Sequence, residues 1–171
     1  KKLGVSTLFN TMGPLLSPAR PEFQIMGIAN PGLGPTIAET MKSLGRSRAL
    51  VVHGAGTDEI AVHGDTLVWE LNDGEISHYT VAPAELGVDK HTLEDIRGGD
   101  GEENAAAMRA TFAGEGPAAH RDAVAVNAGA MFYLYGMADS LAEGTAHAKQ
   151  LLADGSVAQW LRTHEEADYS G

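Results

Sequence analysis

The feature that most constrains this chain's fold is the succession of a strand, a helix and a second strand between residues 23 and 53. Residues 23–29 are typical of a short buried strand, and apolar side chains recur with helical spacing over residues 33–44. Residues 49–52 form the continuous apolar run Ala-Leu-Val-Val, which is typical of a strand buried on both faces of a parallel sheet. The sequence therefore predicts a β-α-β unit.

The rest of the chain extends this unit into an α/β domain. Two more strands, at about residues 66–71 and 75–81, are joined by Asn72-Asp73-Gly74, which favours a tight hairpin. From Gly101 onward the pattern is helical, and Asp100 is placed to cap the first helix while Glu103 reaches back to it. The expected helices cover roughly residues 102–112, 118–135, 140–153 and 156–163. The predicted fold is a mixed, mainly parallel central sheet flanked by helices.

Three prolines between residues 11 and 21 exclude regular helix and central strand, so this stretch suits a rigid junction between domains. We expect a hinge at residues 1–21, an α/β domain at residues 22–164 and a flexible, acidic tail at residues 165–171. With 171 residues and a hydrophobic content of 43%, the chain is long enough for one domain with a full core.

Charge and composition narrow the possible partners. Lys and Arg number 12 against 23 Asp and Glu, and the resulting net charge of -11 opposes binding to nucleic acid or to an anionic membrane surface. The chain has no cysteine, so disulfides and thiolate metal sites are excluded, and its apolar runs are too short to span a bilayer. We expect a cytoplasmic protein.

The turn at residues 53–59, His-Gly-Ala-Gly-Thr-Asp-Glu, is the main candidate site. It follows the buried strand directly, and ligands of open α/β sheets gather beyond the carboxyl ends of parallel strands. Its glycines permit a sharp turn, and Asp58 with Glu59 offers the hard oxygen ligands that Mg²⁺ prefers. On spacing alone, a solvated pair that opens the next strand is the commoner case.

Five ordered blocks along the chain resemble one enzyme family. The second block joins Val51-Val52-His53-Gly54 to the pair Asp58-Glu59, with Thr57 departing from the family's usual Leu or Met. The other blocks are Thr-Leu-Phe-Asn-Thr-Met-Gly-Pro-Leu at residues 7–15, Arg-Gly-Gly-Asp with Glu-Asn-Ala within residues 97–105, Val-Asn-Ala at residues 126–128 and Ser-Leu-Ala-Glu-Gly at residues 140–144. In these blocks the chain is similar to the anthranilate phosphoribosyltransferases.

This resemblance implies an activity and a site. The family transfers the phosphoribosyl group of phosphoribosyl pyrophosphate to the amine of anthranilate, giving N-(5-phosphoribosyl)anthranilate and pyrophosphate in tryptophan biosynthesis, and it depends on Mg²⁺. Asp58 and Glu59 match the family's metal-binding pair, while Pro14, with Gly13 beside it, matches a wall of the anthranilate pocket. His53 is a weaker candidate for contact with substrate, because a histidine that stabilises the turn by bonding to backbone explains its position better.

The resemblance also implies that this chain is only the C-terminal α/β domain of such an enzyme. The family's Gly-Thr-Gly-Gly-Asp phosphate loop and its Lys-His-Gly-Asn segment do not occur in the chain, and its orienting arginine would precede Lys1. Residues 98–100 are better explained as a helix-capping turn than as a phosphate loop. We therefore assign no catalytic residue, and expect the chain to be inactive without an N-terminal helical domain and the full-length protein to be a homodimer.

Two other functions stay open at this point. A pyrimidine nucleoside phosphorylase-like enzyme of related fold would also use a glycine-rich corner, with different basic phosphate-binding residues. A non-catalytic domain of the same fold would bind a partner and not a metal. Metal binding that is lost on replacing Asp58 and Glu59 is expected for the transferase alone.

Overall fold

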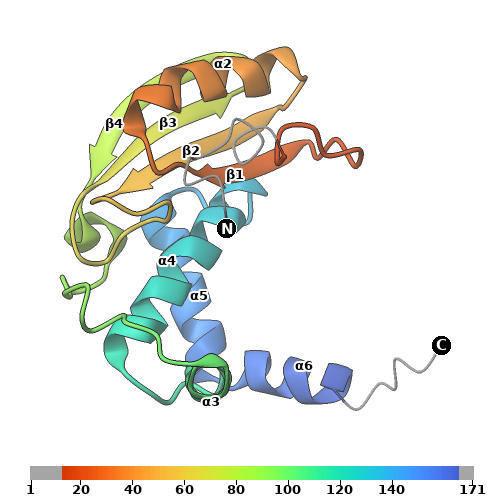
Figure 1. The fold of residues 1–171 in the computed structure, drawn as a ribbon. Coiled ribbons are helices and arrows are strands. Elements are labelled where there is room, and N and C mark those ends of the chain that lie inside the picture. Colours follow the sequence, from red (N-terminus) through yellow and green to blue (C-terminus); the bar gives the residue numbers. More distant parts are fainter. Residues whose placement is uncertain (1–12, 166–171) are drawn as a thin grey trace, which may run out of the picture. The chain divides into compact units, whose positions relative to one another are not determined.

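The computed structural model describes residues 13–165, and their four strands form one sheet (Figure 1). The strands lie in the order β1-β2-β3-β4. Their bounds are Phe23–Gly27 for β1, Arg48–Gly54 for β2, Thr66–Asn72 for β3 and Glu75–Val81 for β4. Each of the four predicted strands is therefore present, and the predicted mixed α/β class is confirmed.

The expectation that the sheet is mainly parallel is wrong for the described residues. Strands β1 and β2 are parallel, whereas β2 with β3 and β3 with β4 are antiparallel. The crossover helix between β1 and β2 returns the chain to the same end of the sheet, which makes that pair parallel. The β3–β4 connection is a two-residue turn in which Asp73 (φ 47°) and Gly74 (φ 87°) both have positive φ, so the chain reverses at once.

The described residues divide into two compact units, the first made of residues 13–60 and 66–81. In this unit the 3-10 turn η1 (Pro31–Leu33) leads into helix α2 (Gly34–Ser43), which packs on β2 and β3 (Figure 1). A Cβ on Gly34 would lie 2.4 Å from the ring of Trp69, so the absence of a side chain lets the helix approach the sheet. The core of this unit consists of Met26, Ile28, Ile37, Ala38, Met41, Ala49, Val51, Trp69 and Leu71.

The second unit, residues 61–65 and 82–165, is helical. It begins with the 3-10 turn η2 and continues through four helices. Their bounds are Pro83–Leu86 for η2, Gly101–Phe112 for α3, Ala118–Leu134 for α4, Leu141–Ala153 for α5 and Ser156–Glu165 for α6. Asp100 accepts hydrogen bonds from the backbone of Glu102 and Glu103, and the Glu103 side chain returns to the Asp100 N–H. The predicted capping box is confirmed.

Helices α4 and α5 pack at close range. A Cβ on Gly129 would lie 2.4 Å from the backbone nitrogen of Thr145, and one on Gly144 would lie 2.2 Å from the Gly129 carbonyl oxygen. Two glycines facing each other thus allow the helix backbones to touch. The contact extends to an apolar cluster centred on Ala125, Ala148 and Leu152.

A buried carboxylate ties the loop after η2 to these helices. The Asp122 side chain is 9% exposed, with Oδ2 lying 2.8 Å from His91 Nε2 and Oδ1 lying 3.1 Å from Lys149 Nζ. Lys149 also donates to the Gly87 carbonyl at 3.0 Å. The three residues come from separate segments of the chain, so no local sequence pattern indicates that they meet.

The predicted hinge and tail lie largely outside the described residues, which begin at Gly13 and end at Glu165. Residues 13–21 form turns without helix or strand, as the prolines require. The domain boundaries stay predictions. Over residues 13–165, each helix is too short or too polar to cross a bilayer, and the cytoplasmic location also stays a prediction.

Candidate metal and substrate site

The turn that carries Asp58 and Glu59 leaves the sheet at the carboxyl end of β2. Gly54 and Thr57 close it with two backbone hydrogen bonds, from Gly54 N–H to Thr57 O at 3.0 Å and from Thr57 N–H to Gly54 O at 2.9 Å. Ala55 (φ 47°) and Gly56 (φ 97°) take the two central positions. Because β1 and β2 are parallel, Asp58 and Glu59 emerge at the end of the sheet where both strands finish.

Gly27, the last residue of β1, lets the acidic turn lie directly against that strand. A Cβ on Gly27 would lie 1.5 Å from the carbonyl oxygen of Asp58 and 2.4 Å from its carbonyl carbon. Any other residue would therefore displace the Asp58 backbone or the end of β1. Sequence analysis missed this role, because nothing local to Gly27 indicates that Asp58 approaches it.

The carboxylates of Asp58 and Glu59 repel each other, and Glu59 is partly desolvated. Both side chains are exposed, but surrounding protein removes some of the water near Glu59, and this desolvation raises the pKa of Glu59. The negative charge of Asp58 raises that pKa further. A divalent cation beside the pair would relieve this repulsion, so the chemistry of the two side chains fits a metal.

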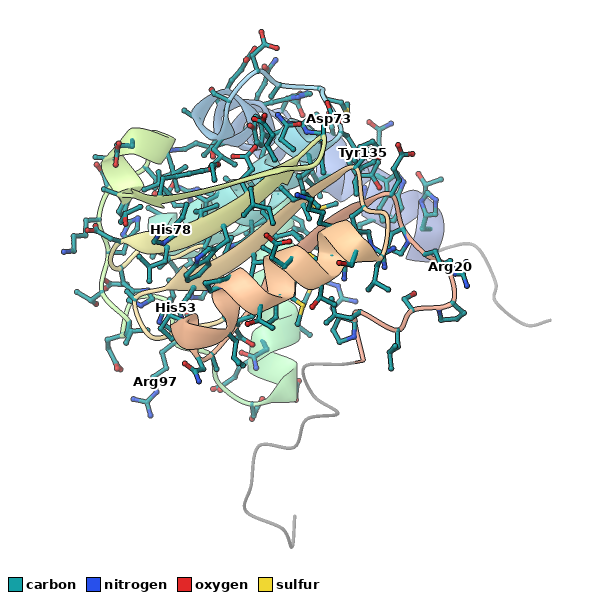
Figure 2. All side chains as sticks on the ribbon, turned by 90° about the horizontal axis from the view of Figure 1, so that it is seen from above. Arg20, His53, Asp73, His78, Arg97 and Tyr135 are labelled. Atoms are coloured by element: carbon teal, nitrogen blue, oxygen red, sulfur yellow. The ribbon has the colours of Figure 1, made fainter. Side chains whose placement is uncertain are left out.

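His53, the first residue of this segment, is held by a hydrogen bond to the backbone of the residue that follows β1. Its Nδ1 lies 2.8 Å from the Ile28 carbonyl oxygen, and because a carbonyl only accepts, Nδ1 carries the proton that it donates. Figure 2 shows His53 on the strand that leads into the turn. The bond matches the interpretation of His53 as a residue that stabilises the turn. Contact with substrate stays a prediction.

Gly13 and Pro14 are exposed on the loop that precedes β1. The Pro14 carbonyl oxygen accepts a hydrogen bond of 3.1 Å from Gln24 Nε2, which anchors the loop to β1. Over residues 13–165, no hydrogen bond joins Gly13 or Pro14 to the acidic turn. The structure therefore unites His53, Asp58 and Glu59 at one end of the sheet, and the assignment of Pro14 to a substrate wall stays a prediction.

The acidic turn offers only part of a metal's coordination shell. In the part of the chain that the structure describes, no three His, Asp or Glu side chains gather to hold a metal ion. A cation at Asp58 and Glu59 would take its remaining ligands from water or from a bound substrate. Mg²⁺ is commonly held in this way, by one or two carboxylates together with phosphate oxygens and retained waters.

Comparison with known proteins gives a consistent family. Residues 1–158 match the glycosyl transferase family, a/b domain. The chain is 68% identical to the anthranilate phosphoribosyltransferase of Corynebacterium aurimucosum, over 99% of this chain and 49% of that protein. It is 46% identical to the anthranilate phosphoribosyltransferase of Shewanella sp. (strain W3-18-1), over 93% of this chain and 46% of that protein. The chain thus spans about half the length of the curated relatives it matches.

Solved structures show the same likeness. The crystal structure of anthranilate phosphoribosyltransferase (TrpD) from Thermus thermophilus superposes with a TM-score of 0.85 at 41% identity, covering 94% of this chain and 47% of that one. The Saccharomyces cerevisiae anthranilate phosphoribosyltransferase in complex with PRPP and Mg is 24% identical and superposes with a TM-score of 0.81 over 93% of this chain and 46% of that one. At that lower identity the likeness is one of fold.

Proposed function

The chain belongs to the glycosyl transferase family, a/b domain, and from this premise we propose that it is the metal-binding half of an anthranilate phosphoribosyltransferase. The reaction joins the C1 carbon of the ribosyl group to the amine nitrogen of anthranilate, and the bond from C1 to pyrophosphate breaks. The amine loses a proton, and pyrophosphate leaves with the electron pair. Two relatives at 68% and 46% identity carry this name, although this chain matches only about half of each.

The observation that carries the proposal is the position of Asp58 and Glu59. They follow β2 at the carboxyl end of the parallel pair, where α/β sheets bind their ligands. Partial burial raises the pKa of Glu59, and the neighbouring charge of Asp58 raises it further, as expected for two adjacent carboxylates that share one site. A solvated pair that opens the next strand would not need the tight approach of its backbone to Gly27.

We assign Asp58 and Glu59 as the residues that hold Mg²⁺. When bound, Mg²⁺ would neutralise charge on the pyrophosphate leaving group, which an acidic chain would otherwise repel. The net charge of -11 makes such neutralisation important for a substrate with several negative charges.

The remaining site residues are assigned to positioning. Gly27 allows the backbone of the acidic turn to lie against β1. The hydrogen bond from His53 to the Ile28 carbonyl holds the end of β2 in place. We assign Gly13 and Pro14 to one wall of the anthranilate pocket, supported by the anchoring of that loop to Gln24. In these roles the residues position the metal and the substrates, and none of them forms or breaks a bond.

We further propose that phosphoribosyl pyrophosphate and anthranilate bind only when an N-terminal helical domain completes the site, and that the complete enzyme is a homodimer in the cytoplasm. The need for a further domain is supported by the share of each relative that the chain covers, which is close to one half. The chain alone is then expected to be inactive.

The proposal is tested by measuring anthranilate consumption by its fluorescence. With the helical domain present, we expect turnover that requires Mg²⁺, and Asp58→Asn/Glu59→Gln should lower kcat/KM for phosphoribosyl pyrophosphate by about 100-fold or more. Glu75→Gln, an exposed carboxylate on β4, is the matched control and should leave the kinetics unchanged. Unchanged kinetics in the double variant, or turnover by the 171-residue chain alone, would contradict the proposal.

A further inference from the structure

A cavity of about 420 Å³ lies in the first unit, between the loop before β1 and the residues that follow α2. Its volume falls within the range of small-molecule sites in proteins. Two serines also line it. The side chains that matter here are the apolar Leu15, Leu16, Pro18 and Leu44 and the cationic Arg20 and Arg46.

Arg46 is a buried cation with donors to spare. The residue is 5% exposed, and its Nε donates to Gln24 Oε1 at 2.9 Å. Over residues 13–165, no other hydrogen bond or ion pair reaches its guanidinium group. A guanidinium keeps its charge at all ordinary pH values and carries five N–H donors, of which the bond to Gln24 uses one. The two terminal nitrogens therefore suit an anion that enters from the cavity.

Arg20 adds a second cation to the lining. The backbone of Arg20 has φ 43°, the left-handed region that favours glycine, and its N–H closes a turn onto the Ser17 carbonyl at 3.1 Å. Within the described residues its side chain takes part in no ion pair. Figure 2 shows Arg20 on the loop that precedes β1.

Charge and apolar surface together define the ligand. None of the lining residues is acidic, in a chain whose net charge is -11, so two arginines here form a local exception. Leu16 is 64% exposed and Leu44 is 43% exposed, which gives the cavity an apolar rim. An arginine fork matches a carboxylate with two parallel hydrogen bonds, and the leucines favour a ligand with an apolar portion.

We propose that this cavity is a binding site for a small organic carboxylate, held by Arg46 and Arg20 and covered by the leucines and Pro18. The site lies where β1 and β2 begin, because Gln24 and Arg46 stand at the starts of these strands, whereas the acidic turn follows the end of β2. Neither Gly13 nor Pro14 lines it. The proposed site is thus separate from the acidic turn, and Gln24 joins Arg46 to the loop that carries Pro14.

The experiment is a titration of the intact protein with hexanoate, followed by amide chemical shifts and by calorimetry. Saturable binding is expected, with shift changes at the lining residues. Arg46→Gln should weaken it by roughly tenfold to a hundredfold, since a charge-assisted hydrogen bond is lost, and Arg20→Gln by a smaller factor. Arg97→Gln, an exposed arginine of the second unit, is the control and should bind like the wild type.

Several results would overturn the proposal. One is the absence of saturable hexanoate binding by the wild type. Another is binding by Arg20→Gln and Leu16→Asp that is as tight as binding by the wild type. Both substitutions lie on the surface, so these variants should fold even if Arg46→Gln does not. Sulfate or hexylammonium binding as tightly as hexanoate would show that a carboxylate with an apolar portion is not what the cavity selects. Displacement of hexanoate by anthranilate would make the cavity part of the substrate site and not a separate one.

Discussion

Replacing Gly27 with alanine tests how the acidic turn is positioned. The new Cβ would lie 1.5 Å from the Asp58 carbonyl oxygen, whereas ordinary van der Waals contact begins near 3.4 Å. Either the end of β1 or the backbone of Asp58 has to shift by about 2 Å. The end of β1 is held in the sheet, and Asp58 directly follows a turn closed by two backbone hydrogen bonds. The clash is therefore between backbone atoms, and no flexible side-chain end can absorb the shift.

Two consequences are expected, with different magnitudes. Overpacking of this kind costs about 1–3 kcal/mol of folding free energy. Mg²⁺ needs oxygen ligands close to about 2.1 Å, with a tolerance of about 0.2 Å, so a shift of the Asp58 backbone should weaken metal binding by about tenfold or more. Urea unfolding measures the first effect, and calorimetric titration with Mn²⁺ in the presence of pyrophosphate measures the second.

The control for Gly27→Ala is Gly101→Ala. A Cβ on Gly101 meets no atom within 4 Å, and alanine is favoured over glycine in a helix, so this variant should be neutral or slightly stabilising. If Gly27→Ala matches the wild type in both urea stability and metal affinity, the close approach of the turn to β1 is refuted. If only its stability falls, the link between Gly27 and the metal pair is refuted.

Two further predictions concern the second unit. Asp122→Ala removes a carboxylate that is 9% exposed and bonds to His91 and to Lys149, whose side chain is 42% exposed. The change should cost about 1–3 kcal/mol in urea unfolding, because a buried, hydrogen-bonded carboxylate is lost while the solvated lysine adds little. A loss under about 0.5 kcal/mol, the range of an ordinary surface substitution, would contradict a structural role for this carboxylate. Hydrogen bonds from the Thr92 hydroxyl and N–H lower the pKa of Asp95. The stability that ionised Asp95 contributes is therefore present above its unfolded-state pKa and is lost as the pH falls through its folded-state pKa. Thr92→Val should raise the pKa of Asp95 in a carboxyl NMR titration, and an unchanged pKa would contradict this cause.

Local patterns were sufficient to predict the elements of the fold. The Asn72-Asp73-Gly74 sequence predicted the hairpin because positive φ at two successive positions is a local requirement. The Asp100 cap was predicted because a capping side chain bonds to backbone N–H groups only two and three residues further along the chain. The first strand ends at Gly27, two residues before the predicted end. The Ile28 N–H still bonds to Val52, whereas the Ile28 carbonyl bonds to the His53 side chain and not to a strand.

Contacts between distant residues were not predictable in this way. Gly27 and Asp58 are separated by a helix and a strand, and no local pattern records that their backbones meet. Arg46 likewise carries no local signal, because its role depends on Gln24 and the cavity beside it. The position of Asp58 and Glu59 after a buried strand did follow from the sequence, whereas their role as metal ligands rests on a resemblance and stays a prediction.

The most direct test of the account is divalent metal binding by the Asp58 and Glu59 pair, measured with Mn²⁺ by calorimetry or electron paramagnetic resonance with and without pyrophosphate. The account predicts one site that tightens when pyrophosphate is present and is lost in Asp58→Asn/Glu59→Gln, while Glu75→Gln binds like the wild type. Equal binding by the double variant and the wild type, or no binding by the wild type even with pyrophosphate, would contradict it.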